Sequence, residues 1–322
     1  MKALVTGGAG CIGSELAAEL LARGAQVIVV DNLSSGKIEH IDGLLKDSRF
    51  EFLEADLLQP GAMDAALGGV DMVFHLAANP DVRFSPGDPT DKDLQQNTLV
   101  TYNVLEAMRR HRVPKLAFAS TSAVYGVAEH LPIPESAPFP KPISLYGATK
   151  LACEALISSF QHLFGLQCWI FRFANIVGSK VRKRGRTVIS DFIYRLKETP
   201  CCLEILGDGR QAKSYLLNAE CVDAMLYVVE HARAPLNIYN LGCDDWISVN
   251  RIADLVVKAM GLPHVQYRYT GTEAGWPGDV PRFRLDVTAL NHLGWKAGHN
   301  SEEAVRIAIH AVFEALEGKV EK

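Results

Sequence analysis

The sequence predicts an α/β fold in which a doubly wound parallel sheet is joined to a smaller α/β domain. Short, apolar, β-branched runs alternate with longer helical patterns through the first half of the chain. This alternation is typical of right-handed βαβ units, which place helices on both faces of a parallel sheet. A glycine-rich turn between the first strand and the first helix supports the same fold class.

The predicted elements of the sheet domain follow one another from the amino terminus. They are strands at residues 3–6, 26–31, 72–75, 115–120 and 168–173, and helices at 14–23, 98–110 and 145–164. After residue 175 the alternation of strand and helix patterns becomes less regular, although helices are expected near 189–197 and 249–260. We therefore expect residues 1–175 to form the sheet domain and 176–322 the smaller domain. A helix-plus-strand pattern at about 215–245 is expected to return to the sheet.

The composition is that of an ordinary globular protein. Of the 322 residues, 48% are hydrophobic and 22% charged, and the formal net charge is −4. Because no basic stripe or long run of like charge occurs, we expect neither nucleic acid nor a membrane surface as a partner. No apolar run reaches the roughly 18–20 residues of a membrane span, and no signal-peptide pattern is present. A cytoplasmic location is therefore expected.

Cysteine usage and the basic residues add two further expectations. The seven cysteines show neither a Cys-x-x-Cys pair nor zinc-ligand spacing, so reduced thiols and no bound metal are expected. Basic residues gather once, within residues 180–186. This cluster is either a solvated loop or a group of side chains near a phosphate, since guanidinium groups suit phosphate oxygens. Its members are Lys180, Arg182, Lys183, Arg184 and Arg186.

The glycine-rich turn is the first candidate cofactor site. Gly7, Gly10 and Gly13 lie between the first strand and the first helix, where glycines permit a tight turn and a close approach of the backbone to a pyrophosphate. The helix start at Cys11 and Ile12 offers unpaired N–H donors to the same anion. Because the glycine pattern lies at the head of a βαβ unit, it predicts a Rossmann-type dinucleotide site.

The next strands end in further candidate cofactor ligands. Asp31 follows the second strand, where a carboxylate accepts hydrogen bonds from ribose hydroxyls and repels a 2′-phosphate, so NAD is favoured over NADP. Asp56 follows a further short strand, the third in chain order, and lies either near the adenine or in a loop that it caps. His75 lies at the end of the fourth strand. Its ring is expected to be hydrogen-bonded to the backbone in a structural role rather than to bind a ligand. The other candidates at these strand ends are Asn32, Leu57, Leu76, Ala77 and Ala78.

The candidate catalytic residues lie on the predicted helix 145–164 and the strand before it. Tyr146 and Lys150 are four residues apart and therefore share one helix face. A nearby ammonium and an oxidised nicotinamide favour the phenolate, which makes Tyr146 a plausible general base. Thr121 ends the fifth strand, where its hydroxyl can share a hydrogen bond with the same substrate oxygen. Ser120 and Ser122 are either further ligands or ordinary turn hydroxyls.

These residues closely resemble the extended short-chain dehydrogenase/reductase family, and within it the UDP-galactose (UDP-glucose) 4-epimerases of compact archaeal type. The resemblance covers essentially the whole chain. It includes the glycine loop and the segments VDNLSSG at 30–36, ASTSAVYG at 119–126, YGATK at 146–150, RFANIVG at 172–178, LGDG at 206–209 and GWPGD at 275–279.

The resemblance implies a full set of site residues and a reaction. Tyr146 would take the proton of the sugar 4-hydroxyl, C4 would give hydride to NAD, and the 4-keto sugar would turn over and be reduced on its other face. It implies that Gly7, Gly10, Gly13, Asp31, Asn32, Asp56 and Lys150 hold NAD and that Thr121 acts on the sugar with Tyr146. Further cofactor contacts are expected at Ser35, Gly36, Asn97, Ser120 and Phe173, with Asn97 supporting the active site. A UDP-sugar is expected at Arg83, Ser122, Asn175, Val188, Lys213, Asp279 and Phe283, with the diphosphate at Asn175. A homodimer through residues 98–110 and 145–164 is also implied.

Two motifs depart from the family pattern. Many relatives carry an Arg-Asp pair where this chain has Lys213 and Ser214, and an arginine where it has Trp276. Lysine keeps the charge but loses the bidentate fork, so Lys213 is a candidate diphosphate ligand, and Arg83 or the basic cluster is expected to compensate. Phe283 stands at the family's size gate, where a bulky ring disfavours an N-acetyl group.

Other functions are weighed against these residues. A 4,6-dehydratase is expected to carry Asp-Glu after the active threonine, and a UDP-glucuronate decarboxylase carries Glu at the second of these positions. Ser122 and Ala123 stand there instead. A UDP-glucuronate 4-epimerase stays open, because Arg83 or the basic cluster could contact the carboxylate. A non-catalytic NAD-binding sensor is disfavoured by the complete set of Thr121, Tyr146 and Lys150.

Overall fold

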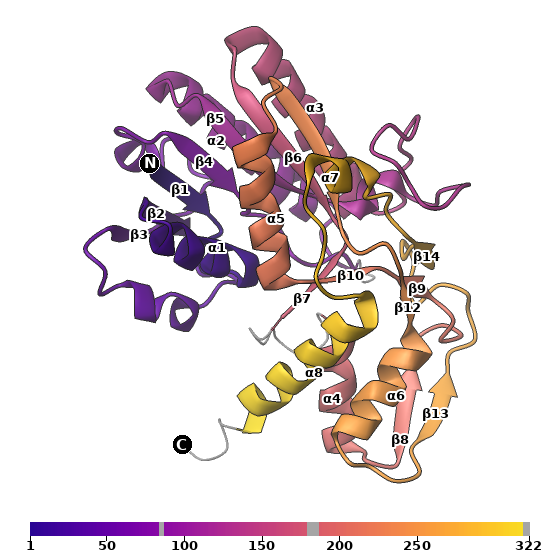
Figure 1. The fold of residues 1–322 in the computed structure, drawn as a ribbon. Helices are drawn as coiled ribbons and strands as arrows, with labels where there is room; N and C mark the ends of the chain where they lie inside the picture. Colours follow the sequence, from indigo (N-terminus) through magenta and orange to yellow (C-terminus); the bar gives the residue numbers. More distant parts are fainter. Residues whose placement is uncertain (84–86, 179–186, 318–322) are drawn as a thin grey trace.

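The computed structural model describes residues 1–83, 87–178 and 187–317, and Figure 1 shows a lobe built on a central sheet above a smaller lobe. Seven parallel strands form the sheet in the order β11-β6-β5-β4-β1-β2-β3. Their bounds are β1 (Lys2–Thr6), β2 (Gln26–Asp31), β3 (Phe50–Glu54), β4 (Met72–His75), β5 (Lys115–Thr121), β6 (Gln167–Phe173) and β11 (Leu236–Leu241). The strand order reverses between β1 and β4, which is where such sheets bind ligands. The predicted Rossmann-type fold is confirmed.

Helices cover both faces of this sheet because successive side chains of a strand point to opposite sides. Val27 and Val29 of β2 belong to the core formed with α1 (Cys11–Ala22) and α5 (Asn218–His231). Ile28 and Val30, which alternate with them, belong to the core formed with α2 (Val100–His111) and α3 (Leu145–Phe164). Burial on both faces explains why the strands of the sheet read as nearly continuous apolar runs.

Helix α3 begins and ends at clear local signals. The hydroxyl of Ser144 accepts a hydrogen bond of 3.0 Å from the N–H of Gly147 and so caps the first turn. Gly165 ends the helix in the left-handed conformation, with φ at 71°. These bounds agree with the predicted helix at 145–164. Helix α2 differs from its prediction, because a π-helical segment, η4 (Leu94–Leu99), precedes it and extends the helical chain toward the amino terminus.

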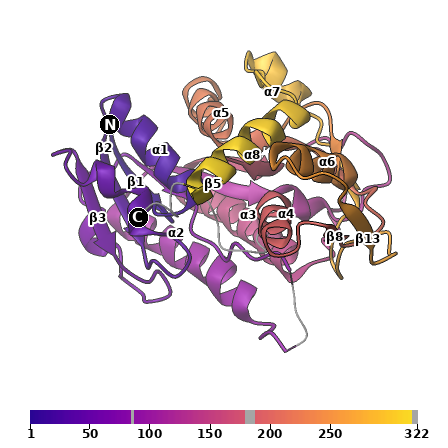
Figure 2. The ribbon, with the colours of Figure 1, turned by 90° about the horizontal axis from the view of Figure 1, so that it is seen from below.

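The smaller lobe has a hydrophobic core of its own. Helices α4 (Val188–Glu198), α6 (Val249–Ala259) and α8 (Ser301–Glu317) pack around it, and Figure 2 shows them gathered together. The parallel strands β8 (Cys202–Ile205) and β13 (Gln266–Tyr269) close its outer side. Helices were predicted at the positions of α4 and α6, whereas α8 was not.

The chain returns to the larger lobe after the first part of the smaller one. Helix α5 packs against α1, and β11 pairs with β6 at the edge of the seven-stranded sheet. Leu290 of α7 (Thr288–Leu293) and the following Trp295 join the same core. We propose that residues 1–175 and about 215–245 form one domain, with the later α7 segment packed on it.

Short strands place side chains from the smaller lobe beside the sheet. Strand β7 (Asn175–Val177) pairs with β10 (Tyr215–Leu217), and β9 (Ala212–Lys213) lies between β12 (Ile247–Ser248) and β14 (Arg282–Phe283). In this register Phe283 is the partner of Lys213. The remaining short helices are η1 (Ile38–His40), η2 (Asp42–Leu44), η3 (Asp64–Ala66) and η5 (Ser122–Tyr125).

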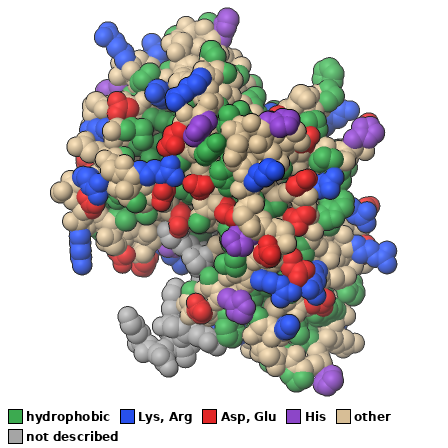
Figure 3. Space-filling view, viewed as in Figure 1, with side chains coloured by type: hydrophobic (Ala, Val, Ile, Leu, Met, Phe, Trp, Pro, Cys, Tyr) green, Lys and Arg blue, Asp and Glu red, His purple; other side chains and the backbone are tan. Residues whose placement is uncertain are grey.

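The surface carries charges of both signs. Figure 3 shows Lys and Arg side chains interspersed with Asp and Glu over the face in view. None of the described helices has the length and apolar character needed to cross a membrane. The seven cysteines are free thiols, of which Cys153, Cys168, Cys221 and Cys243 are buried.

Candidate functional site

The glycine loop forms one end of a cavity of about 180 Å³ at the carboxyl ends of β1, β2, β4 and β5. Gly7 has φ at 68°, and a side chain there would lie 2.7 Å from the backbone nitrogen of Ala77. A side chain at Gly13 would meet the carbonyl of Gly7. The sequence therefore requires glycine at this turn, and α1 begins at Cys11 with its first N–H groups facing the loop.

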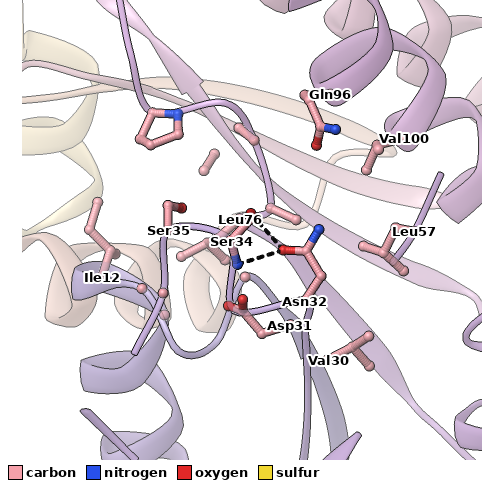
Figure 4. Close-up of a pocket in the computed structure, with 18 of the residues that line it drawn as sticks. Ile12, Val30, Asp31, Asn32, Ser34, Ser35, Leu57, Leu76, Gln96 and Val100 are labelled. Carbon is pink, nitrogen blue, oxygen red and sulfur yellow. Dashed lines mark hydrogen bonds between the residues drawn. The ribbon is translucent and has the colours of Figure 1, made fainter. Parts of the chain in front are cut away.

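The other end of this cavity is formed by Asp31 and the segment after it. The two carboxylate oxygens of Asp31 accept hydrogen bonds from the N–H of Ala9 at 3.0 Å and that of Leu33 at 2.9 Å. Burial raises the pKa of Asp31, and these two bonds act in the opposite direction. Figure 4 shows Asp31 and Asn32 facing the cavity, with the Asn32 amide oxygen accepting from Ser34.

The donor set of this cavity fits an adenine dinucleotide. A carboxylate suits the ribose hydroxyls and the helix start suits a pyrophosphate. The predicted cofactor residues that line it are Gly7, Gly10, Cys11, Ile12, Gly13, Asp31, Asn32, Ser35, Gly36, Asp56, Leu57, Leu76, Ala77, Ala78, Ser120, Tyr146, Lys150 and Phe173. Asp56 also caps its own loop, because its carboxylate accepts from the N–H of Leu58 at 2.9 Å. Gln96 and Val100 line the same cavity and no sequence motif marks them.

A second cavity of about 320 Å³ lies between the two lobes. The predicted substrate residues that line it are Arg83, Thr121, Ser122, Tyr146, Asn175, Val188, Lys213, Asp279 and Phe283. Lys213 Nζ is 2.5 Å from Asp279 Oδ1, so this ammonium is already paired with a carboxylate. Arg83 lies over the ring of Trp276, with Cζ 4.5 Å from the ring centroid. The basic cluster at 180–186 lies outside the described residues.

The two cavities meet at Tyr146. Ile12, Pro80, Ser120, Tyr146 and Phe173 line both. A dinucleotide in the first cavity and a ligand in the second would therefore come together at this phenol. The hydroxyl of Thr121 is nearby on the second cavity and accepts a hydrogen bond of 3.1 Å from the N–H of Ala123, which fixes its orientation.

Lys150 lies beneath this junction, one helical turn from Tyr146. Its side chain is almost fully buried, with 2% of the residue exposed. The ammonium donates a hydrogen bond of 2.8 Å to the carbonyl of Ala119 and lies 4.6 Å from the ring centroid of Phe118. Burial lowers the pKa of Lys150 to about 8, against the opposing influence of nearby thiol and carboxylate groups. The group is therefore charged at neutral pH and becomes neutral under mildly alkaline conditions.

A buried ion pair extends this contact along the same face of α3. Glu154 follows Lys150 by one turn and accepts a hydrogen bond from the Ser120 hydroxyl at 2.5 Å. The guanidinium of Arg172 donates three bonds to Glu154, the shortest at 2.7 Å, and another to the hydroxyl of Tyr125 at 2.9 Å. One carboxylate therefore joins α3 to the ends of β5 and β6. The Ser120 hydroxyl, predicted as a cofactor contact, points its proton at Glu154.

Two polar residues considered in the sequence analysis, Asn97 and His75, form hydrogen bonds within the protein. Asn97 lines neither cavity; its amide oxygen accepts from the N–H of Asn79 at 2.9 Å and its nitrogen donates to the Thr149 hydroxyl at 3.0 Å. It ties the loop after β4 to α3 rather than reaching the cofactor cavity. The ring nitrogens of His75 lie 2.7 Å from the Thr6 hydroxyl and 3.0 Å from that of Thr101. Burial, with a smaller effect of Lys150, lowers the pKa of His75 to about 3, so it is a neutral structural residue.

Two residues that line the second cavity were not predicted from the sequence to be ligands. The amide oxygen of Gln211 is buried with no hydrogen-bond partner among the described residues, although its nitrogen donates to the carbonyl of Leu206 at 2.9 Å. The indole nitrogen of Trp276 is likewise buried without a partner there. Both residues line the second cavity. Only the family comparison singled out Trp276, as a departure from an arginine.

Comparison with known proteins identifies the arrangement. Residues 3–242 match the model of the NAD dependent epimerase/dehydratase family. This chain belongs to that family. The UDP-glucose 4-epimerase of Mycolicibacterium smegmatis is 31% identical over 304 residues, which are 92% of this chain and 93% of the relative. The predicted place in the extended short-chain dehydrogenase/reductases, beside the UDP-glucose 4-epimerases, is confirmed.

Solved structures of family members have the same fold over nearly the whole chain. A crystal structure of UDP-galactose 4-epimerase matches with a TM-score of 0.86 at 39% identity, covering 98% of this chain and 99% of the other. A UDP-glucuronic acid 4-epimerase from Bacillus cereus, in complex with UDP-glucuronic acid and NAD, matches with a TM-score of 0.88 at 27% identity, covering 98% and 100%. Both kinds of sugar therefore occur among epimerases of this shape.

The Glu154–Arg172 pair gives a test of how the site is held. We expect Glu154→Gln to lower the free energy of unfolding by about 3–5 kcal/mol, because it leaves the buried guanidinium without its counter-charge. Chemical denaturation monitored by circular dichroism measures this. The matched control is Glu302→Gln, which breaks solvent-accessible ion pairs with Arg251 (2.8 Å) and Arg306 (2.5 Å) and should cost much less because solvent screens those pairs. Equal losses in the two variants would contradict the role given to Glu154.

Proposed function

We propose that this chain is an NAD-dependent epimerase that inverts C4 of a UDP-hexose, with UDP-glucose and UDP-galactose as the preferred pair. The observation that carries the proposal is the position of Tyr146, where the dinucleotide cavity and the inter-lobe cavity meet. Lys150 and Thr121 beside it supply the charge and the hydroxyl that this chemistry needs.

The roles of the chain's own residues follow from their surroundings. Asp31 and the glycine loop would hold NAD, which when bound supplies a reversible acceptor for the hydride of C4. Tyr146 takes the proton of the 4-hydroxyl as that bond is oxidised, and returns it when the hydride comes back to the other face of the sugar. The positive charge of Lys150 stabilises the phenolate that is present before the proton is taken and again after it is returned. Thr121 orients the oxygen, because its own orientation is fixed by Ala123.

The choice of sugar is argued from two lining residues. Phe283 is a buried ring in the wall of the cavity and belongs to a hydrophobic cluster with Val124 and Leu285. A larger N-acetylated hexose would have to displace this packed ring, which costs free energy. Phe283 therefore disfavours the N-acetylated sugars. Arg83 in the same wall keeps a UDP-glucuronate 4-epimerase as the second candidate, since a guanidinium also suits a carboxylate.

A panel of sugar nucleotides tests the proposed reaction. The purified protein is incubated with UDP-glucose, UDP-galactose, UDP-glucuronate and UDP-N-acetylglucosamine without added reductant, and the anomeric proton signals are followed by NMR. We expect the glucose and galactose forms to interconvert fastest and the N-acetylated form at least about tenfold more slowly, in line with size discrimination in apolar pockets. Tyr146→Phe should lose at least about a hundredfold in rate, because it has no proton to exchange.

The outcomes separate the candidates. A new epimer from UDP-glucuronate alone would replace the proposed substrate while keeping the reaction. Comparable turnover of UDP-N-acetylglucosamine would contradict the role of Phe283. If Tyr146→Phe keeps the parent rate while binding NAD equally well, the proposed mechanism is wrong.

We also propose that the protein is a homodimer that pairs through α2 and α3. Apolar side chains are exposed at these helices and their ends: Leu99, Tyr102, Leu163 and Phe164. Exposed apolar groups gathered on neighbouring helices mark interaction surfaces. Sedimentation equilibrium should give a dimer for the parent. The double variant Tyr102→Glu, Leu163→Glu should be a monomer, since a charge in an apolar interface is unfavourable. A monomeric parent at micromolar concentration would exclude the dimer.

A further inference from the structure

Trp276 lies in the wall of the inter-lobe cavity, on a short hydrogen-bonded loop. Its loop, residues 275–279, is closed by two hydrogen bonds: Gly275 N–H donates to the Asp279 carboxylate at 3.0 Å, and Asp279 N–H to the Trp276 carbonyl at 3.0 Å. Gly278 has φ at 89°, and a side chain there would lie 3.1 Å from the carbonyl of Ile143, just before α3. The backbone that carries the indole therefore packs against the residues just before the helix of Tyr146.

Two cations from different lobes lie against this indole. Arg83 comes from the loop after β4, and its Cζ is 4.5 Å from the ring centroid. Lys213 comes from β9 in the smaller lobe, and its Nζ is 5.2 Å from the centroid. Both distances are within the range in which a cation is attracted by an aromatic ring. The ring thus holds two positive groups at the cavity wall that would otherwise repel each other.

The two cations at this wall differ in their partners. Lys213 is paired with Asp279 at 2.5 Å. No carboxylate within residues 1–83, 87–178 or 187–317 forms an ion pair with Arg83, although Asp81 and Asp191 line the same cavity. An anionic ligand in the cavity could therefore pair with Arg83.

The indole itself also lacks a partner. Trp276 Nε1 is buried and has no hydrogen-bond acceptor among the described residues. A buried donor without an acceptor is unfavourable, and native structures rarely keep one without a reason. The N–H needs an acceptor, and the Arg83 guanidinium over the same ring favours an acceptor that carries negative charge. A diphosphate offers several such oxygens.

We propose that Trp276 is the organising residue of the diphosphate subsite: its N–H donates to a phosphate oxygen and its ring holds Arg83 and Lys213 on either lobe for the same group. This inference rests on the proposed function, because it takes the ligand of the cavity to be a UDP-sugar. It assigns to Trp276 and Arg83 together the contact that an arginine at position 276 would otherwise make. The subsite forms only when both lobes contribute.

Binding of UDP, which undergoes no reaction, tests the subsite apart from catalysis. The NAD-loaded protein is titrated calorimetrically with UDP, and uridine binding is followed by NMR as the ligand without phosphate. Trp276→Leu removes the ring and the N–H, whereas Trp276→Phe keeps a ring and removes only the N–H. The matched control is Trp246→Leu, which removes an exposed tryptophan 5.9 Å from the guanidinium of Arg284, outside the cavity.

We expect Trp276→Leu to weaken UDP binding at least about tenfold, and Trp276→Phe to weaken it by a smaller factor, since a ring still faces the cations. Uridine binding should stay unchanged in both. The dependence of UDP affinity on salt concentration should be shallower in Trp276→Leu than in the parent, because one charged contact is lost. The control should bind both ligands as the parent does.

Three results would overturn the inference. Unchanged UDP affinity in Trp276→Leu would show that the indole does not serve the diphosphate. An equal loss for uridine would show that the ring shapes the nucleoside site instead. If Arg83→Gln binds UDP like the parent but loses affinity only for UDP-glucuronate, Arg83 recognises a sugar carboxylate. A protein that binds UDP as expected but converts no sugar would refute the proposed function and leave the subsite standing.

Discussion

The contact between the buried ammonium of Lys150 and the carbonyl of Ala119 ties α3 to β5 at the point where both cavities open. Burying an ammonium is unfavourable unless polar partners replace water, and the lowered pKa of this group reflects that cost. One turn earlier on the same helix face lies Tyr146, and one turn later lies Glu154. Lys150 and Glu154 therefore set the register of α3 on the sheet, and with it the distance between the phenol and Thr121.

The rest of the site depends on that register. Glu154 links β5 to β6 through Ser120 and Arg172. The end of β6 supplies Phe173 to both cavities, and β7 supplies Asn175 to the second. The loop of Trp276 packs against the residues that precede α3. A shift of α3 would thus move Tyr146, the strand ends and the wall of the second cavity together. This coupling explains why a deeply buried charge network is kept in a protein whose cores are otherwise apolar.

The sequence predicted the larger lobe well because its signals are local. The glycine turn, the apolar strands and the capped helix at 145–164 each follow from residues close together in the chain. The position of Asn97 could not be predicted, because its partners Asn79 and Thr149 come from separate segments. The pairing of Lys213 with Asp279 and the contact of Arg83 with Trp276 join residues that are 66 or more positions apart. Such tertiary contacts decide whether a cation is available to bind a ligand, and local sequence patterns do not predict them.

The central claim is that a buried ammonium sustains the base Tyr146, and the pH dependence of turnover tests it most directly. With a pKa of about 8, Lys150 is protonated below that pH and loses its charge as the pH rises through it. We predict that kcat falls above about pH 8 in the parent. Lys150→Met should be at least about tenfold slower at neutral pH, because the phenolate loses its stabilising charge, and should show no fall near pH 8. Parent and variant sharing one pH profile, after NAD occupancy is matched, would contradict the account.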